Sequence, residues 1–220
     1  MDFLCIGDRM EDMTHTNKKG FTLIELLIVI GILAILATAV ILILNPVQLF
    51  KQARDSQRIS DLATMKSALA FYLSTVSSPS LGTAATCYAY QSAGVALPAD
   101  CDLRHTASAE VYSAALSVGD GIGGSLGWIP VDFGKVPGGA PLSVLPRDPQ
   151  SGAGRFYSFV SNGSSTFELN ADMESDRYQC GGSDDVEKTD GGDKPLAVDP
   201  CPADQTDSVY EVGNDPGLNL

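Results

Sequence analysis

The chain has 220 residues, of which 44% are hydrophobic, and carries a formal net charge of −13. This length suffices for one membrane helix and one modest domain, and the acidic balance argues against a nucleic-acid-binding groove, which needs clustered Lys and Arg. The two histidines, His15 and His105, lie far from other likely ligands at metal-site spacing, so a histidine-based catalytic centre is poorly supported.

Residues 1–20 form a polar leader that ends in two lysines and a glycine, MDFLCIGDRMEDMTHTNKKG. Met10 and Met13 offer later start positions within this segment. A start at Met13 would give the short basic leader MTHTNKKG, and it would remove Cys5 together with the acidic residues. With either start, a basic segment directly precedes the apolar stretch that begins at Phe21.

Residues 21–44 are mostly apolar, with Glu25 as their only charge. As a helix this stretch would be about 36 Å long, against about 30 Å of bilayer hydrocarbon. A cleaved secretory signal has a shorter apolar core, followed by a small-x-small site. A plain membrane anchor explains the length but leaves Glu25 unexplained, because a carboxylate inside the bilayer costs free energy.

The segment KKGFTLIELLIVIGILAIL resembles the amino-terminal signature of type IV pilins and pseudopilins. That signature is a basic leader ending in glycine, then phenylalanine, then a mostly apolar helix with glutamate as the fifth mature residue, and residues 18–26 match it position by position. The resemblance implies that prepilin peptidase cleaves between Gly20 and Phe21 and that the new Phe21 amine is N-methylated. The apolar helix then stays with the mature protein.

The resemblance also gives Glu25 a physical role. Cleavage creates a cationic amine at Phe21, and a carboxylate one turn away, on the same or a neighbouring subunit, can pair with it. In an apolar bundle each charge alone is costly, and the pair offsets much of that cost. Glu25 is therefore predicted to be an assembly residue that sets subunit register, the alternative being a tolerated carboxylate at the membrane interface.

Residues 45–78 are predicted to be the exported half of the helix. Pro46 removes a backbone donor and is expected to kink or loosen the helix around residues 42–45. Apolar residues recur at three- or four-residue steps and predict a stripe covered by a sheet: Ile59, Leu62, Met65, Leu69, Leu73 and Val76. The charged residues at polar positions of this helix are expected to face water or a neighbouring subunit: Lys51, Arg54, Asp55, Arg58 and Asp61. The segment SSPS at 77–80 ends the helix.

Residues 79–175 are predicted to form a small antiparallel sheet. The strand candidates are residues 126–133, 155–161 and 165–174, with the turn SNGSS joining the last two. Residues 86–90 fit a short strand or a turn, and residues 110–118 fit a strand or a short helix. The expected fold class is α+β, with a long amino-terminal helix packed on the sheet, which is the arrangement that the pilin resemblance implies.

Four cysteines follow the apolar segment: Cys87, Cys101, Cys180 and Cys201. An even number beyond a membrane segment suggests an oxidising compartment and two disulfides. Of the three possible pairings, the local one is favoured, Cys87–Cys101 and Cys180–Cys201, and each such loop would contribute roughly 3 kcal/mol. Four free thiols are the alternative.

Residues 176–220 are predicted to be an acidic region closed by a disulfide. Its oxygen-rich loops would suit calcium, with Asp184, Asp185, Asp190 and Asp193 as candidate ligands, and some secretion pseudopilins carry a carboxy-terminal calcium site. The EF-hand loop pattern is absent, so a solvated loop without a cofactor is the preferred interpretation. The segment GDGIGG at 119–124 lacks the lysine of a phosphate-binding loop.

No constellation of residues typical of a catalytic site is present, so the chain is not expected to be an enzyme. The resemblance implies a filament subunit of a type IV pilus, or alternatively a pseudopilin of a type II secretion machine. A membrane-tethered binding protein is a third possibility. The implied partners are other copies of the chain, other pilins or pseudopilins, prepilin peptidase, the inner-membrane assembly platform and membrane lipid. The implied topology is a single pass through the cytoplasmic membrane with the carboxy-terminal domain outside, assembled into an extracellular or periplasm-spanning filament.

Overall fold

The computed structural model describes residues 20–84, 86–93, 113–117, 121–122, 126–153, 155–187 and 209–214. The chain divides into two units, Met1–Asn45 and Pro46–Leu220. Several residues of the sequence predictions lie outside the described ranges: His15, Cys101, His105, Asp190, Asp193 and Cys201.

In the first unit, the helix α1 (Leu23–Leu44) has apolar residues around its whole circumference. Its described side chains are all exposed. Its segment Leu23–Ile41 is long and apolar enough to cross a membrane. The helix ends where Asn45 adopts a left-handed backbone with φ of 39°, a conformation that Asn tolerates at helix ends. The prediction that Pro46 interrupts the helix around residues 42–45 agrees with this break.

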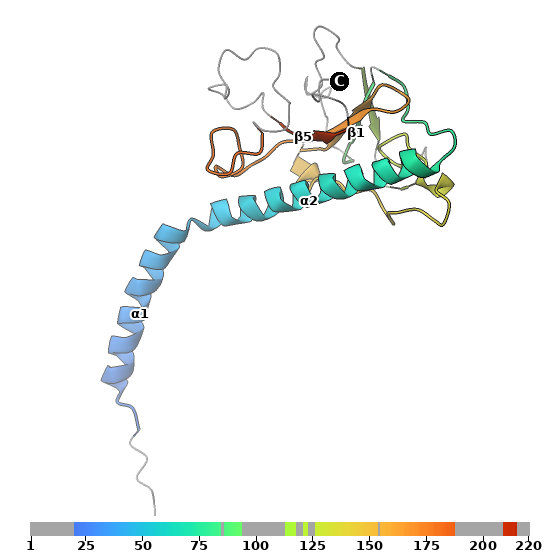
Figure 1. The fold of residues 1–220 in the computed structure, drawn as a ribbon. Coiled ribbons are helices and arrows are strands. Elements are labelled where there is room, and N and C mark those ends of the chain that lie inside the picture. Colours follow the sequence, from blue (N-terminus) through green and yellow to red (C-terminus); the bar gives the residue numbers. More distant parts are fainter. Residues whose placement is uncertain are drawn as a thin grey trace, which may run out of the picture. The chain divides into compact units, whose positions relative to one another are not determined.

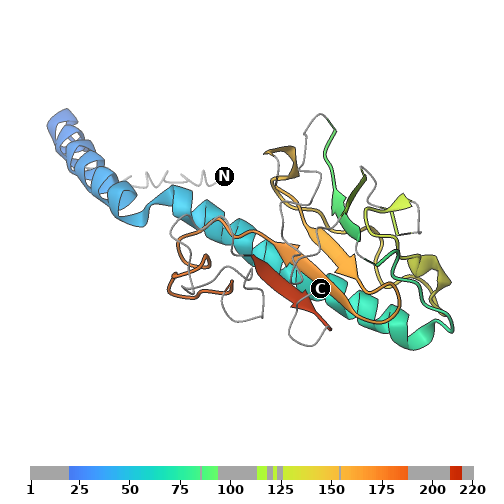
Figure 2. The ribbon, with the colours of Figure 1, turned by 90° about the horizontal axis from the view of Figure 1, so that it is seen from above.

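The second unit consists of a long helix and a five-stranded sheet. The helix α2 (Pro46–Thr75) lies along one face of the sheet (Figure 1 and Figure 2). The strand order is β2 (Ser113–Ser117), β1 (Thr86–Tyr90), β3 (Ser158–Ser161), β4 (Phe167–Ala171) and β5 (Tyr210–Gly213). The pairs β1–β3, β3–β4 and β4–β5 are antiparallel, whereas β2 runs parallel to β1. The predicted α+β fold with an antiparallel sheet is confirmed, and β2 is its one parallel exception among the described strands.

The hairpin β3–β4 forms where the turn SNGSS was predicted. The side chain of Asn162 organises this turn, because its Oδ1 atom accepts hydrogen bonds from the backbone N–H groups of Ser164, Ser165 and Thr166 at 2.9–3.1 Å. Asn is favoured in turns for this ability to bond the backbone that follows it. Gly163 supplies the positive φ of 84° that the turn requires.

The strand predicted at residues 126–133 is wrong. The segment contains no strand; it bends through Pro130 and leads into the short 3₁₀-helix η3 (Phe133–Lys135), which the Asp132 side chain caps by accepting from Gly134 N–H at 3.0 Å. Trp128, Ile129 and Val131 are nevertheless all buried in the core. The backbone here is irregular instead of extended, and it packs these apolar side chains onto the core.

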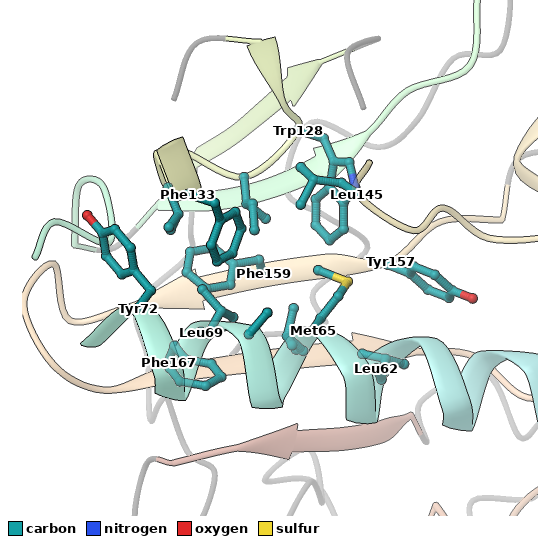
Figure 3. Packing of buried hydrophobic residues seen from close by; sticks show 14 of the residues in the cluster. Leu62, Met65, Leu69, Tyr72, Trp128, Phe133, Leu145, Tyr157, Phe159 and Phe167 are labelled. Atoms are coloured by element: carbon teal, nitrogen blue, oxygen red, sulfur yellow. The ribbon is translucent and has the colours of Figure 1, made fainter. Parts of the chain in front are cut away.

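The core of the second unit lies between α2 and the sheet. Leu62, Met65 and Leu69 project from α2 toward aromatic side chains of the sheet and its loops, among them Phe159 and Phe167 (Figure 3). The rings of Tyr72 and Phe133 pack edge to face, with their centroids 5.8 Å apart. The predicted apolar stripe of α2 is therefore correct for its central members, and it fixes which face of α2 meets the sheet.

A second 3₁₀-helix, η4 (Ser151–Ala153), precedes β3. The strand β5 pairs with β4 in register, with Leu169 opposite Val212. Nothing in the sequence predictions placed a strand at this position, which lies in the segment 176–220.

Candidate functional site

The predicted cleavage position lies immediately before α1. Phe21 is 91% exposed, and Gly20 is also exposed, with no atom within 4 Å of the position that a Cβ would take. The backbone on both sides of the Gly20–Phe21 bond is therefore open to an enzyme. α1 begins only at Leu23, so the bond is not protected by helical hydrogen bonds.

Glu25 lies in the first turn of α1 and forms a reciprocal capping box with Thr22. The Oε2 atom of Glu25 accepts from the backbone N–H of Thr22 and from the Thr22 hydroxyl, both at 2.8 Å. The hydroxyl oxygen in turn accepts from the Glu25 N–H at 3.2 Å. Two of the donors that a helix start leaves unsatisfied are thereby bonded.

The role of Thr22 was missed by the sequence predictions, which placed Thr22 in the pilin-like signature and gave it no function. A signal was available, because Thr-x-x-Glu before an apolar run is the capping-box pattern. The capping box therefore begins one residue after Phe21, next to the predicted cleavage position.

A second charged cluster lies inside the unit Pro46–Leu220, around Arg58 of α2. Its guanidinium contacts three carboxylates: Asp148 through Nε at 2.7 Å and Nη2 at 3.0 Å, Asp55 through Nη1 at 2.7 Å, and Glu174. Arg58 and Asp55 are fully buried. The prediction that these two residues face water or a neighbouring subunit is therefore wrong, because their charges are neutralised within the domain and need no outside partner.

Residues 172–187, which follow β4 and which we call the strap, are held against α2 by this cluster. Asp55 accepts hydrogen bonds from the backbone N–H groups of Glu174 and Ser175 at 2.8–3.1 Å. Glu174 also pairs with Arg54, at 3.0 Å to Nε and 2.6 Å to Nη2. Further toward the start of α2, the Gln48 amide donates to the Asp176 carboxylate at 3.0 Å.

Two glutamates of the strap have opposite pKa shifts. Burial would raise the pKa of Glu174, but the hydrogen bonds from Arg54 and Arg58 outweigh burial and lower the pKa to about 2. Burial raises the pKa of Glu187 to about 7, although the N–H groups of Met173 and Cys180 donate to its carboxylate. The carboxylates of Asp172 and Asp185 add to this increase.

Asp61 of α2 is linked to the sheet by a hydrogen bond of 2.9 Å from the hydroxyl of Tyr157. Burial raises the pKa of Asp61 above its ordinary value, and it raises that of Tyr157 as well. The raised pKa of Tyr157 keeps its hydroxyl neutral, so that it can donate to Asp61. This contact therefore ties α2 to the segment that enters β3.

The cysteine predictions are only partly within the described residues. Cys87 and Cys180 are buried and disulfide-bonded. Because Cys101 and Cys201 lie outside those residues, the pairing Cys87–Cys101 and Cys180–Cys201 stays a prediction.

The alternative of a calcium site, which the sequence analysis did not prefer, is likewise untested as a whole, because two of its four aspartates lie outside the described ranges. Asp184 forms an ion pair with Arg177, and Asp185 accepts from the backbone N–H groups of Gly181 at 2.8 Å and Glu187 at 3.0 Å. Among the described residues, no group of three or more His, Cys, Asp or Glu side chains is arranged to hold a metal ion.

Comparison with known proteins gives a match at the amino-terminal stretch that contains Gly20, Thr22 and Glu25. Residues 15–41 match the family model of the prokaryotic N-terminal methylation motif, which is the prepilin signature of type IV pilins and pseudopilins. Searches of the curated proteins and of the solved structures gave no match. The matched range contains the cleavage position, Thr22 and Glu25, so the chain carries a pilin-type amino terminus on an α+β domain.

Proposed function

We propose that this pilin-like chain is a structural subunit of a type IV pilus or a related filament. Its precursor is inserted in the cytoplasmic membrane, cleaved by prepilin peptidase between Gly20 and Phe21, methylated at the Phe21 amine and polymerised through α1. One observation carries the proposal: the matched signature, residues 15–41, includes most of α1, a helix whose surface is apolar on all sides and whose only charge is Glu25.

The exposed apolar surface of α1 suits both environments in which such a subunit would reside, the membrane and the filament. In the membrane, lipid would cover the side chains that the isolated chain exposes. In a filament, the same surface would be covered by the α1 helices of neighbouring subunits, and the charged pair would then decide their axial offset. The domain that begins at Pro46 would lie outside the membrane, where it meets other copies or other pilins.

The charge chemistry of assembly follows from the position of Glu25. Cleavage converts the amide nitrogen of Phe21 into a cationic amine at the end of the mature chain. This amine and the Glu25 carboxylate would be costly if buried separately, and each lowers the cost of the other when paired. An ion pair of this kind between subunits would make Glu25 an assembly residue. The partners in this process would be prepilin peptidase, which creates the amine, and the inner-membrane assembly platform.

The decisive experiment compares Glu25→Ala with the unmodified chain in cells that process and assemble it. Insertion, cleavage and folding of the second unit should be unchanged, whereas the filament yield should fall sharply. Breaking a buried pair from one side costs about 3–5 kcal/mol, which is ample to shift a polymerisation equilibrium. Normal filaments together with normal processing would show that the carboxylate is incidental.

Two further variants sharpen the comparison. Glu25→Gln retains the shape without the charge and should be nearly as poor as Glu25→Ala, whereas Glu25→Asp shortens the reach and should be intermediate. The location of the filaments then separates the two systems. Filaments on the cell surface support a pilus subunit, and short filaments confined to the periplasm support a secretion pseudopilin.

A further inference from the structure

The two oxygens of the Glu25 carboxylate are in different situations. Oε2 accepts both hydrogen bonds from Thr22, at 2.8 Å each, whereas Oε1 has no hydrogen bond to any residue that the structure describes. We propose that Thr22 is a positioning residue for subunit assembly, which fixes Glu25 through Oε2 and leaves Oε1 for the incoming amine. This inference rests on the proposed function, since it requires that Glu25 pairs with a Phe21 amine.

Thr22 is the one neighbouring side chain of α1 and its cap that can hydrogen-bond Glu25. Every other residue between Phe21 and Thr38 is apolar or glycine, so no side chain in the neighbouring turns of α1 besides that of Thr22 can hydrogen-bond the carboxylate. Thr22 contributes three contacts at once: its N–H and its hydroxyl donate to Oε2, and its hydroxyl oxygen accepts from the Glu25 N–H. The side chain of Glu25 is thereby tied to the helix start before any partner arrives.

The hydrogen-bonding capacity of a carboxylate allows both partners to bind together. Each oxygen can accept about two hydrogen bonds, so an amine at Oε1 need not displace Thr22 from Oε2. A methylated amine at Phe21 would retain two N–H donors, enough for one bond to this oxygen. Holding the carboxylate in place beforehand lowers the entropy that is lost when the subunit docks.

The capping box also survives maturation. Cleavage between Gly20 and Phe21 converts the amide nitrogen of Phe21 into an amine, but the peptide bond that carries the Thr22 N–H remains intact. All donors and acceptors of the box therefore belong to the mature chain. Thr22 can hold Glu25 both in the membrane-resident subunit and in the filament.

The test uses the full chain with Thr22→Val, which keeps the shape of threonine and removes the hydroxyl, and Thr22→Ser, which keeps the hydroxyl. The measured quantity is the ratio of filament subunits to processed subunits in the membrane fraction. Thr22→Val should lower this ratio by about tenfold, the value of one hydrogen bond to a charged group. Thr22→Ser should stay within about twofold of the unmodified chain. An unchanged ratio in Thr22→Val, or equal losses in both variants, would overturn the proposal.

A second comparison separates positioning of Glu25 from simple capping of the helix. Thr22→Val is combined with Glu25→Asp, whose side chain is one methylene shorter and is therefore expected to bond Thr22 less well. If Thr22 acts through the carboxylate, the loss caused by Thr22→Val shrinks in this background; an undiminished loss would mean that Thr22 only caps α1. Glu25→Ala, measured in parallel, reports on the proposed function itself, because normal assembly there removes the role of Glu25 whatever Thr22 does.

Discussion

Arg58 and Asp148, which lie 90 positions apart in the chain, form a bidentate ion pair that is closed to solvent. Nε of Arg58 is 2.7 Å from one carboxylate oxygen of Asp148, and Nη2 is 3.0 Å from the other. The same guanidinium contacts Asp55 on its own helix and Glu174 in the strap. One arginine thus joins α2 to two loops that are distant in sequence, and its position determines how both loops meet the helix.

The first prediction concerns the loss of this arginine. Arg58→Met keeps much of the side-chain volume but leaves the carboxylates of Asp55 and Asp148 buried without their cation. The free energy of unfolding should fall by about 3–5 kcal/mol, the cost of breaking a buried ion pair from one side. The measurement is denaturant unfolding of the full chain in detergent, followed by the fluorescence of Trp128, the single tryptophan, which is buried.

The control for Arg58→Met is Arg177→Met, because Arg177 pairs with Asp184 at the surface, where both side chains are about half exposed. Solvent screens such a pair, so its removal should have little effect on unfolding. Equal effects of the two substitutions would show that the buried cluster contributes no more than a surface contact.

The second prediction is acid sensitivity of the strap through Glu174. Its pKa is lowered from 4.5 to about 2 in the folded state. The contribution of Glu174 to stability is therefore present above about pH 4.5 and is lost as the pH falls toward 2. Unfolding curves between pH 5 and pH 2 should show this loss in the unmodified chain, and Glu174→Gln should show a shallower pH dependence over the same range. Equal slopes would contradict the assignment.

The third prediction places an opposite pH dependence on Glu187. Its pKa is raised from 4.5 to about 7, so the folded state favours the protonated carboxyl. The stability contributed by this group is complete below about pH 4.5 and is lost progressively as the pH rises through 7, by about 3 kcal/mol in total. Glu187→Gln cannot ionise, so its stability should vary less between pH 5 and pH 8 than that of the unmodified chain, whatever the absolute cost of the substitution.

The described elements that depend on local pattern were predictable from the sequence. Leu62, Met65 and Leu69 recur at helical spacing, and the break at Asn45 follows from the missing donor of Pro46. The turn at Asn162 follows from the ability of Asn to bond the backbone beyond it. In each case the determining interaction lies within a few residues, so the sequence alone contains it.

The elements that depend on distant contacts were not predictable. Arg58 lies among polar residues of α2 and looks solvent-exposed in the sequence; only the arrival of Asp148 and Glu174 makes it buried. The segment around Trp128 has a strand-like composition. In the structure, however, it is an irregular loop packed on the core, in which the Trp128 Nε1–H group donates a hydrogen bond to the carbonyl of Pro146 at 2.9 Å. Neither pairing leaves a periodic signal in the sequence.

The fourth prediction is that the unit Pro46–Leu220 contains the disulfides Cys87–Cys101 and Cys180–Cys201. Non-reducing peptide mapping of protein taken from its native compartment should recover both linked peptide pairs, with Cys5 in neither. Free thiols at all four positions would contradict the prediction, and crossed pairs would contradict the local pairing alone. Cys180→Ser should also loosen the strap, since the disulfide holds in place the backbone whose N–H donates to Glu187.

The last prediction concerns maturation. The exposed Gly20–Phe21 bond and the match over residues 15–41 lead us to expect a mature chain that begins at Phe21 and carries one methyl group on its amine. Mass spectrometry of the membrane or filament fraction would measure both changes directly. Gly20→Ala should slow cleavage less than a bulky substitution at the same position, because the peptidase requires a small residue before the bond. A mature chain that still contains Lys18 and Lys19 would show that cleavage does not occur at Gly20, and it would also remove the amine on which the pairing with Glu25 depends.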